Sequence, residues 1–260
     1  MAVNLEGGCR VSEMREGESF TEGSLRIWNR VGRATGAQAI SLRILEFAPG
    51  LSPAIRNQDC DELLYVVDIR TAGGDGSVNL SIDGQSFVVG PDTGIYIRPG
   101  QTFSVDNSGP CSVVFVSSQC PDPNRSPQFV TSPATASHDL RLQHRPPIVR
   151  LEDRPAQSTA DRWYRVLVDD EIGSTQVTQF VGSIPPGRAP NHFHNYEEVL
   201  FILKGKGRMW AGETHTPIAP GSCIYLPKGQ VHCVENTGED ELRLLGVFYP
   251  AGSPSVSYDV

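Results

Sequence analysis

Short apolar runs separated by turn signals dominate the hydrophobic pattern of the chain. The run at residues 199–203 (VLFIL) is unbroken, which indicates a buried strand. Turn signals such as Asp83-Gly84 and Pro220-Gly221 separate runs of this kind. No long stretch repeats its apolar residues with the 3.6-residue period of a helix. Regularly spaced short strands are typical of a sandwich or barrel, so the pattern predicts an all-β protein.

The chain also repeats itself. The matching pairs are TGAQAISLRILEFAPG (35–50) with IGSTQVTQFVGSIPPG (172–187), and PDTGIYIRPGQTFSVDNSG (91–109) with PGSCIYLPKGQVHCVENTG (220–238). Such self-similarity indicates two copies of one β-fold in tandem.

A stretch rich in proline, serine and threonine separates the two copies and has the composition of a linker. We therefore expect an N-terminal unit at residues 1–130, a linker at 131–150 and a C-terminal unit at 151–260. One strand near Ile148 is a candidate for docking onto a unit from within the linker.

Composition narrows the setting. The formal net charge of −8 over 260 residues argues against a general nucleic-acid binder, which needs a basic face. No apolar run approaches the roughly 18 residues of a membrane helix, and the polar N-terminus has no signal-peptide core. The six cysteines lack CxxC spacing, so we expect reduced thiols in a cytoplasmic protein.

Chemistry is concentrated beside the apolar run at 199–203. His192 and His194 are spaced by one residue, so in a strand they point to the same face, as two nitrogen ligands of one metal ion do. Glu198 can supply an oxygen, and His232 follows in the segment GSCIYLPKGQVHCVEN. Buried imidazoles and carboxylates need a partner, and a metal ion is one.

These residues resemble the two motifs of the cupin superfamily. The first motif is Gly187 … His192-x-His194-x3-Glu198-x6-Gly205, with four rather than five positions between Gly187 and His192. The second is Gly221-x5-Pro227-x-Gly229-x2-His232-x3-Asn236. The resemblance, extended by the repeat, is to a bicupin. It implies two jelly-roll β-barrels in tandem and a metal held in the C-terminal barrel by His192, His194, Glu198 and His232.

Three nitrogens and one carboxylate leave coordination positions open, which is the mark of a catalytic rather than a structural site. Manganese, iron, nickel, copper and zinc all tolerate this ligand set, so we expect one divalent transition metal ion of undetermined identity. A metal-free polar cluster is the alternative.

The first half keeps only one of the four ligand positions, as Glu62. The histidine positions hold Ile55, Asn57 and Phe103. Because isoleucine and phenylalanine cannot bind a cation, we expect an N-terminal barrel without metal. A stabilising role is favoured for it over a second small-molecule pocket.

Residues near the motifs are candidates for lining the mouth of the metal-binding barrel. They are Arg165, Gln179, Tyr196 and Tyr225. Glu197 points to the opposite face from Glu198 in a regular strand, which predicts a solvated carboxylate.

Three function classes fit a site of this kind. The favoured one is a metal-dependent enzyme of small-molecule metabolism that acts on an organic acid, a sugar acid or a related carbonyl compound. Its Lewis-acid reaction would be an isomerisation, hydrolysis, decarboxylation or lyase reaction. The alternatives are an oxygen-dependent dioxygenase and a non-catalytic ligand-binding cupin, which the fold cannot separate. We expect a small-molecule partner, no nucleic acid and no membrane, and either a homodimer or a compact monomer.

Overall fold

The computed structural model describes residues 1–57, 59–67, 76–121, 127–131, 146–159 and 161–255. Most of the expected linker lies outside these residues. Within the described ranges the chain is built from short strands, which confirms the all-β prediction. The helical segments there are three short 3₁₀ turns, η1 (Glu6–Gly8), η2 (Arg33–Thr35) and η3 (Leu151–Asp153).

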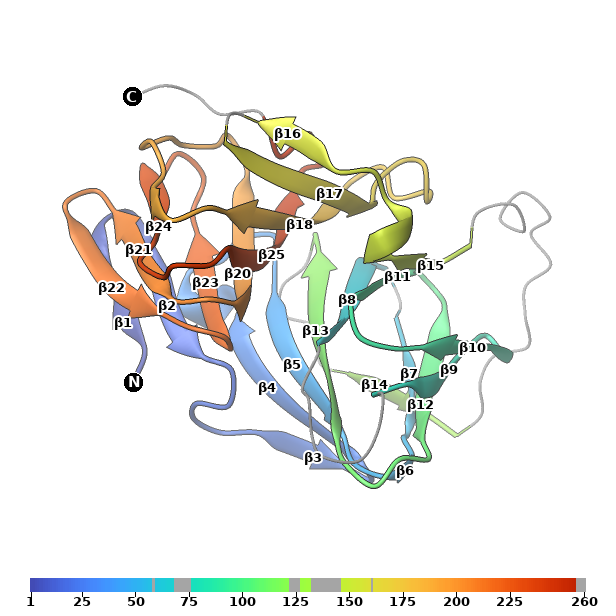
Figure 1. The fold of residues 1–260 in the computed structure, drawn as a ribbon. Coiled ribbons are helices and arrows are strands. Elements are labelled where there is room, and N and C mark those ends of the chain that lie inside the picture. The colour runs from blue at the N-terminus through green and yellow to red at the C-terminus, as the bar shows by residue number, and fades with distance from the viewer. Residues whose placement is uncertain (58, 68–75, 122–126, 132–145, 160, 256–260) are drawn as a thin grey trace.

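The strands form two barrels, each made of one large and one smaller antiparallel sheet (Figure 1). In the first barrel, the large sheet has the order β15 (Ile148–Arg150), β11 (Thr93–Ile97), β8 (Asp61–Val67), β13 (Val113–Cys120), β5 (Leu42–Phe47), β4 (Leu25–Val31) and β3 (Phe20–Glu22). Its smaller sheet has the order β10 (Gln85–Val89), β9 (Val78–Ile82), β12 (Thr102–Asn107), β7 (Ala54–Arg56) and β14 (Gln128–Val130), with β6 (Gly50–Leu51) also paired to β12.

The second barrel repeats this plan. Its large sheet has the order β1 (Val3–Asn4), β2 (Arg10–Glu13), β23 (Ser222–Leu226), β20 (Glu197–Lys204), β25 (Leu242–Tyr249), β18 (Thr178–Ile184), β17 (Arg162–Val168) and β16 (Gln157–Thr159). Its smaller sheet has the order β19 (Gly187–Arg188), β24 (His232–Asn236), β21 (Gly207–Ala211) and β22 (Thr214–Ile218).

The two barrels exchange strands. Figure 1 shows β1 and β2, in blue, beside the orange strands of the second barrel, and β2 pairs there with β23. In return β15, at the position expected for a docked strand, pairs with β11 of the first barrel. The N-terminal strands β1 and β2 thus lie in the large sheet of the second barrel, and β15, from the end of the expected linker, lies in that of the first.

Three hydrophobic clusters hold the structure together. One fills each barrel, and the third lies between the two large sheets. Strand β20 shows how the alternation of side chains serves both purposes: Leu200 and Ile202 belong to the barrel core, whereas Val199 and Phe201 belong to the cluster between the barrels. Both faces of the large sheets are therefore buried, so their strands read as continuous apolar runs.

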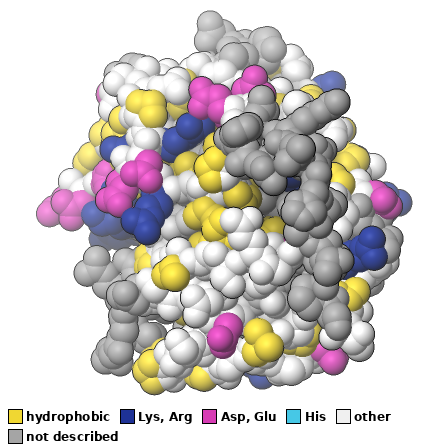
Figure 2. Space-filling model, turned by 90° about the vertical axis from the view of Figure 1, so that its right-hand side faces the viewer, with side chains coloured by type: hydrophobic (Ala, Val, Ile, Leu, Met, Phe, Trp, Pro, Cys, Tyr) yellow, Lys and Arg dark blue, Asp and Glu magenta, His cyan; other side chains and the backbone are white. Residues whose placement is uncertain are grey.

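The surface carries few large apolar side chains. Figure 2 shows one side of the molecule, on which basic and acidic side chains lie next to one another and hydrophobic side chains are scattered. No helix in the described ranges has the length and apolarity needed to cross a bilayer. All six cysteines are free thiols.

Candidate metal centre

The three motif histidines meet in the C-terminal barrel. His192 and His232 form a two-way backbone bridge, with N–H to O distances of 3.1 and 2.9 Å. The carbonyl of His194 accepts the backbone N–H of Gly229 at 2.8 Å. These bonds fix the short segment that precedes β20 against the start of β24. The candidate ligand nitrogens of the three rings all lie within 4.8 Å of one another.

Glu198, the fourth expected ligand, lies next to two of the imidazoles. Its Oε2 lies 3.8 Å from Nε2 of His194 and 3.9 Å from Nε2 of His232. Ligands on an ion with bonds of about 2.1 Å lie roughly 3–4 Å apart, so the four groups need only a small contraction to share one ion.

The outer nitrogens of two rings are already engaged. Nδ1 of His192 lies 3.0 Å from the carbonyl oxygen of Pro190, and Nδ1 of His232 lies 2.8 Å from that of Gln230. A carbonyl oxygen only accepts, so Nδ1 carries the proton in each ring and Nε2 presents its lone pair to the centre. Such outer hydrogen bonds commonly orient metal-binding histidines.

A stack of rings positions the third histidine. The ring of His194 lies 4.6 Å from that of Tyr196 and nearly parallel to it, and Tyr196 in turn stacks on Phe248 at 4.3 Å. Tyr196 therefore lies beside the candidate centre, where it supports a ligand.

Burial decides the charge of the site. It lowers the pKa of His232 to about 3, with neighbouring imidazoles adding to the effect, and it also lowers the pKa of His192. Burial raises the pKa of Glu198 to about 8. The imidazoles of His192 and His232 are thus kept neutral, as ligation requires, while burial disfavours the charged form of Glu198 unless a cation is near. A divalent cation satisfies both conditions, so the residues fit a metal ion.

The centre faces a small cavity with a wider mouth. The inner cavity has a volume of about 130 Å³ and includes apolar side chains such as Phe180, Leu200 and Leu244 in its wall. Phe180 leans over Gly246, where a Cβ atom would lie only 2.3 Å from the ring, so only glycine fits there. The mouth holds about 520 Å³ and is bordered by Arg162 and Arg188.

Three of the four expected pocket residues lie elsewhere. Nη1 of Arg165 donates to the carbonyl of Leu151, and Nε2 of Gln179 donates across to the carbonyl of Leu64 in the first barrel. The hydroxyl of Tyr225 donates to Glu197 at 2.6 Å, outside the barrel. These placements correct the prediction: each side chain is on the outer face of its strand, which packs on the other barrel.

Glu197 corrects a second expectation. Its side chain is buried rather than solvated, and its carboxylate accepts the backbone N–H groups of Gln38, Ala39 and Ile40 at 2.7–3.2 Å. Glu197 does face away from Glu198, but the first barrel covers that face of β20.

The sequence pattern did not single out Arg162, Arg188 and Phe180. Arg162 is three positions before Arg165 and therefore faces the other side of β17, towards the cavity. Phe180 differs in the same way from Gln179. Glu198 shows which face of β20 points into the barrel. Neighbouring strands share that face, so their inward positions, Arg162 and Phe180 among them, could have been inferred from the sequence.

The described part of the first barrel places other residues at the four positions. Ile55 pairs with Phe103, as His192 pairs with His232, which confirms the alignment of the repeat. Glu62 accepts hydrogen bonds from Arg43 at 2.5 Å, Ser117 at 2.7 Å and Gln119 at 3.0 Å. The expectation that this barrel carries no metal stays a prediction.

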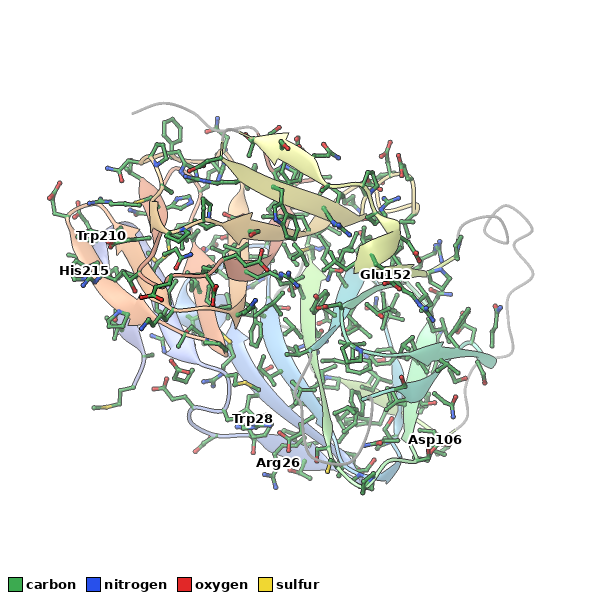
Figure 3. All side chains as sticks on the ribbon, in the orientation of Figure 1. Arg26, Trp28, Asp106, Glu152, Trp210 and His215 are labelled. Carbon is green, nitrogen blue, oxygen red and sulfur yellow. The ribbon has the colours of Figure 1, made fainter. Side chains whose placement is uncertain are left out.

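Trp210 and His215 pack against each other. Figure 3 shows Trp210 and His215 together at the outer edge of the second barrel, where their rings are 4.1 Å apart. Neither takes part in the histidine cluster.

Comparison with known proteins agrees with this architecture. The Cupin domain family model matches residues 180–248, which contain all four candidate ligands. Auxin-binding protein 1 of Arabidopsis thaliana is 35% identical over 83 residues, which are 28% of this chain and 42% of that protein. The oxalate-binding protein of Thermotoga maritima is 35% identical over 66 residues, covering 25% of this chain and 54% of that protein.

Other relatives carry the comparison further. An uncharacterized protein of Aquifex aeolicus is 32% identical over 87 residues, which are 32% of this chain and 70% of its own length. For the auxin-binding relatives from Arabidopsis and Nicotiana tabacum, the chain spans under half of their length, at 42% and 46%.

Solved structures extend the similarity to both barrels. Structures of variants of Bacillus subtilis oxalate decarboxylase superpose with a TM-score of 0.73 at 16% identity, covering 95% of this chain and 78% of that protein. A further solved structure of that enzyme is described in terms of its Mn(II) centers. At this identity, the similarity shows the fold alone.

Proposed function

This chain belongs to the cupin superfamily as a bicupin, and on that premise we propose that it is a metal-dependent enzyme acting on a small organic acid. The convergence of three imidazoles and Glu198 in one cavity carries the proposal. A bound divalent ion there supplies Lewis-acid chemistry to a substrate carbonyl or hydroxyl group.

The chain's own residues restrict the substrate. The inner cavity of about 130 Å³ has room for about four water volumes, and therefore for only a few heavy atoms. Its apolar wall limits water at the centre. A substrate that fits is a short acid, such as a hydroxy acid, a keto acid or a small dicarboxylate.

Two guanidinium groups at the mouth favour an anion. Arg188 is held in place by Trp210, with its guanidinium carbon 3.9 Å from the ring centre, and by Asn191, which accepts a hydrogen bond at 3.3 Å. Arg162 borders both the mouth and the inner cavity, and its Nε lies 3.3 Å from Asp161. One positive charge remains after Asp161 is counted, and planar guanidinium groups bind carboxylates in a two-bond geometry.

The inner cavity offers few groups for acid–base catalysis besides the candidate metal ligands. Among the described residues that line the inner cavity, the carboxyl and imidazole groups are those of the four candidate ligands. Proton transfer would then involve either Glu198 or Asp161 at the mouth. This arrangement is consistent with a reaction driven mainly by the ion.

A second candidate is a ligand-binding protein without catalysis. It is favoured by the relatives whose names describe binding, of auxin in one case and oxalate in another. It uses the same ion and the same arginines but predicts binding without turnover.

One experiment separates these functions from each other and from the dioxygenase. The purified protein is analysed for metal, and then incubated with a panel of hydroxy acids, keto acids and dicarboxylates, with and without oxygen, while products are followed by NMR. Turnover that does not need oxygen supports the proposal, and turnover only with oxygen supports the dioxygenase. Saturable binding without turnover supports the ligand-binding protein.

The recognition step has its own matched pair of variants. Arg188→Ala should raise KM for the acid about tenfold, because it removes one charge-assisted contact. Arg208→Ala changes an exposed arginine on β21 that pairs with Glu235 and should leave KM unchanged. Equal effects of the two substitutions would argue against recognition at the mouth.

A further inference from the structure

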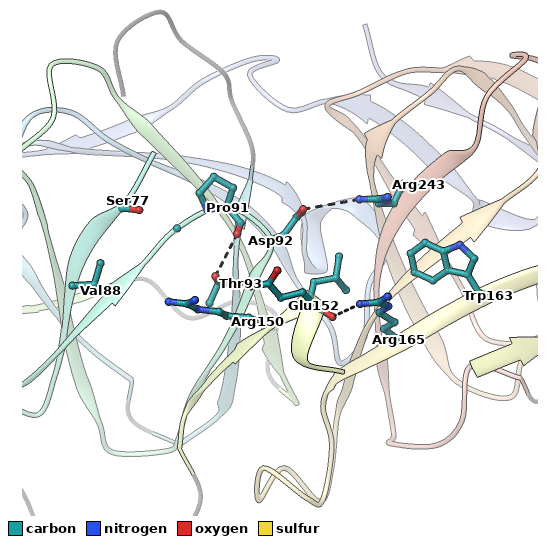
Figure 4. Close-up of a pocket in the computed structure, with 12 residues that line it drawn as sticks. Ser77, Val88, Pro91, Asp92, Thr93, Arg150, Glu152, Trp163, Arg165 and Arg243 are labelled. Atoms are coloured by element: carbon teal, nitrogen blue, oxygen red, sulfur yellow. Dashed lines mark hydrogen bonds and ion pairs between the residues drawn. The ribbon is translucent and has the colours of Figure 1, made fainter. Parts of the chain in front are cut away.

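A second pocket lies between the two barrels, outside the metal centre. Its volume is about 500 Å³, in the range of pockets that bind small metabolites. Figure 4 shows residues from both halves around it: Asp92 and Thr93 from the first barrel, and Trp163, Arg165 and Arg243 from the second. None of the candidate metal ligands lines this pocket.

Two guanidinium groups are fixed there by one indole. The guanidinium carbons of Arg165 and Arg243 lie 5.5 and 5.6 Å from the ring centre of Trp163, within the range of cation–π attraction. Arg165 also donates to the carbonyl of Leu151 at 2.8 Å, and Arg243 is bonded to Glu241 at 2.5 Å. These contacts hold both cations in place and use only part of their donors.

A third cation reaches the pocket from the exchanged strand β15. The Arg150 side chain is exposed, and no hydrogen bond or ion pair joins its guanidinium group to another described residue. Its charge is therefore available to a ligand at little cost in other contacts.

Acidic side chains also lie at this pocket. Asp92 lies 4.0 Å from Arg243 and accepts the hydroxyl of Tyr65 at 2.6 Å, and Glu152 also lines the pocket. The lining thus holds three guanidinium groups and two carboxylates, and Glu241, outside the lining, pairs with Arg243. The guanidinium donors that these pairs leave free can still form charge-assisted hydrogen bonds with a small anion.

We infer that this pocket binds a small metabolite with two or more carboxylate or phosphate groups, held by Arg150, Arg165 and Arg243. The guanidinium groups come from three strands, so a ligand with one acidic group would leave some of them unused. Planar guanidinium groups suit carboxylate and phosphate oxygens equally, so the shared chemistry is that of a multivalent anion.

The pocket between the barrels shares a wall residue with the cavity of the metal centre. Trp163 lines both the pocket between the barrels and the inner cavity of the metal site. A ligand that draws Arg165 and Arg243 towards itself acts on the indole between them, and so on a wall of the other cavity. This regulatory part rests on the proposed function, whereas the binding site itself does not.

Calorimetry on the full-length protein tests the site with two probes, citrate and inorganic phosphate, against sodium chloride at equal ionic strength. We expect saturable binding of at least one probe, and a change in tryptophan fluorescence that Trp163→Phe removes. Citrate binding alone identifies a carboxylate ligand, and phosphate binding alone a phosphate ligand. Binding of neither probe beyond the salt control overturns the inference.

Variants make the test specific. Arg150→Ala and Arg243→Ala should each weaken probe binding about tenfold, the cost of one charge-assisted contact. Arg56→Ala is the matched control, since Arg56 is also an exposed arginine on a short strand but lies outside the pocket. If Arg56→Ala weakens binding as much, the effect is one of net charge and the site is not where we place it.

Metal content measured on the same samples keeps the two proposals apart. Probe binding that persists in protein unable to hold a metal ion overturns the proposed function and leaves this site standing. A metal-loaded protein that turns over acids but binds neither probe overturns the anion site between the barrels and leaves the proposed function standing.

Discussion

The two barrels bury a glutamate at the same place and stabilise it in different ways. Glu62 and Glu198 occupy matching positions, opposite Ile97 and Leu226 on the neighbouring strands. Glu62 is met by the guanidinium of Arg43, whose side chain is only 5% exposed. Glu198 lies 3.9 Å from the imidazole of His232, which burial keeps neutral.

The strand pairings show that the residues around the two glutamates occupy matching positions in the two barrels. Arg43 faces Ser117 in the first barrel as Phe180 faces Gly246 in the second. Where one barrel has an arginine and a hydroxyl bonded to its glutamate, the other has an aromatic ring over a glycine. A buried carboxylate needs a cation: the first barrel supplies one as a side chain, and the second offers a set of donors that could hold a metal ion.

The largest expected effect comes from His232→Ala, which removes an imidazole from the candidate metal centre around Glu198. Loss of a group that only orients a ligand costs 10- to 100-fold in metal affinity, so loss of a ligand should cost at least about 100-fold. We expect bound metal and any turnover to disappear, with a modest loss of stability because the site opens to solvent. Metal analysis and the acid panel measure this. His215→Ala is the control, and full metal content in His232→Ala would show that the site is wrongly assigned.

Breaking the buried ion pair of Arg43 and Glu62 in the first barrel should reduce stability instead. Arg43→Met removes the cation and leaves Glu62 buried without one, which typically costs about 3–5 kcal/mol in the free energy of unfolding. Metal content should not change. Urea denaturation followed by circular dichroism measures the loss.

The double variant Arg43→Met/Glu62→Met sharpens this test. An apolar pair of similar volume often replaces a buried ion pair at little cost, so the double variant should recover most of the loss. If it is no more stable than Arg43→Met alone, the loss comes from packing and not from the uncompensated charge.

Phe103→Ala tests the position that matches His232. Phe103 is 1% exposed and pairs with Ile55, so its ring fills the space that a ligand and an ion share in the other barrel. We expect unfolding to become easier by about 3 kcal/mol, the usual cost of emptying such a position. Metal content should stay unchanged, the reverse of His232→Ala. A thermally silent Phe103→Ala would mean that the first barrel is not packed around this ring.

The sequence predicted those features that depend on local spacing. The four candidate ligands lie within two short segments whose turns bring them together, and the repeat aligned Ile55 and Phe103 correctly with two of them. Features that depend on what covers a strand could not be read in this way. The alternation of side chains along a strand predicts that Glu197 faces away from Glu198. It does not predict that the first barrel lies on that side.

Arg43 was missed for a related reason. Its charge stands out within the apolar segment ISLRILEF, but its role depends on the pairing of β5, β13 and β8, which are distant in sequence. The exchanged strands β2 and β15 are short and leave no signal of which barrel they join.

The smallest expected effect compares the outer faces of the two barrels. Next to each inner glutamate stands a carboxylate that points to the other barrel and accepts a tyrosine hydroxyl: Asp61 from Tyr96, and Glu197 from Tyr225. The two differ in what the opposite barrel provides. Asp61 receives one side-chain amide, from Gln176 at 3.2 Å. Glu197 receives three backbone N–H groups from residues 38–40.

Neutralising these carboxylates should therefore have unequal costs. Hydrogen bonds to a charged acceptor are worth about 1 kcal/mol more than neutral ones, and an amide in place of Glu197 turns an N–H group towards donors. We expect Glu197→Gln to lower the free energy of unfolding by about 2 kcal/mol and Asp61→Asn by about 1 kcal/mol, measured by urea denaturation. Backbone donors cannot turn away, whereas the Gln176 side chain can rotate to a new partner. Equal losses would mean that the tyrosine bonds, which both barrels share, account for the effect, and that the backbone donors add nothing to the contact between the barrels.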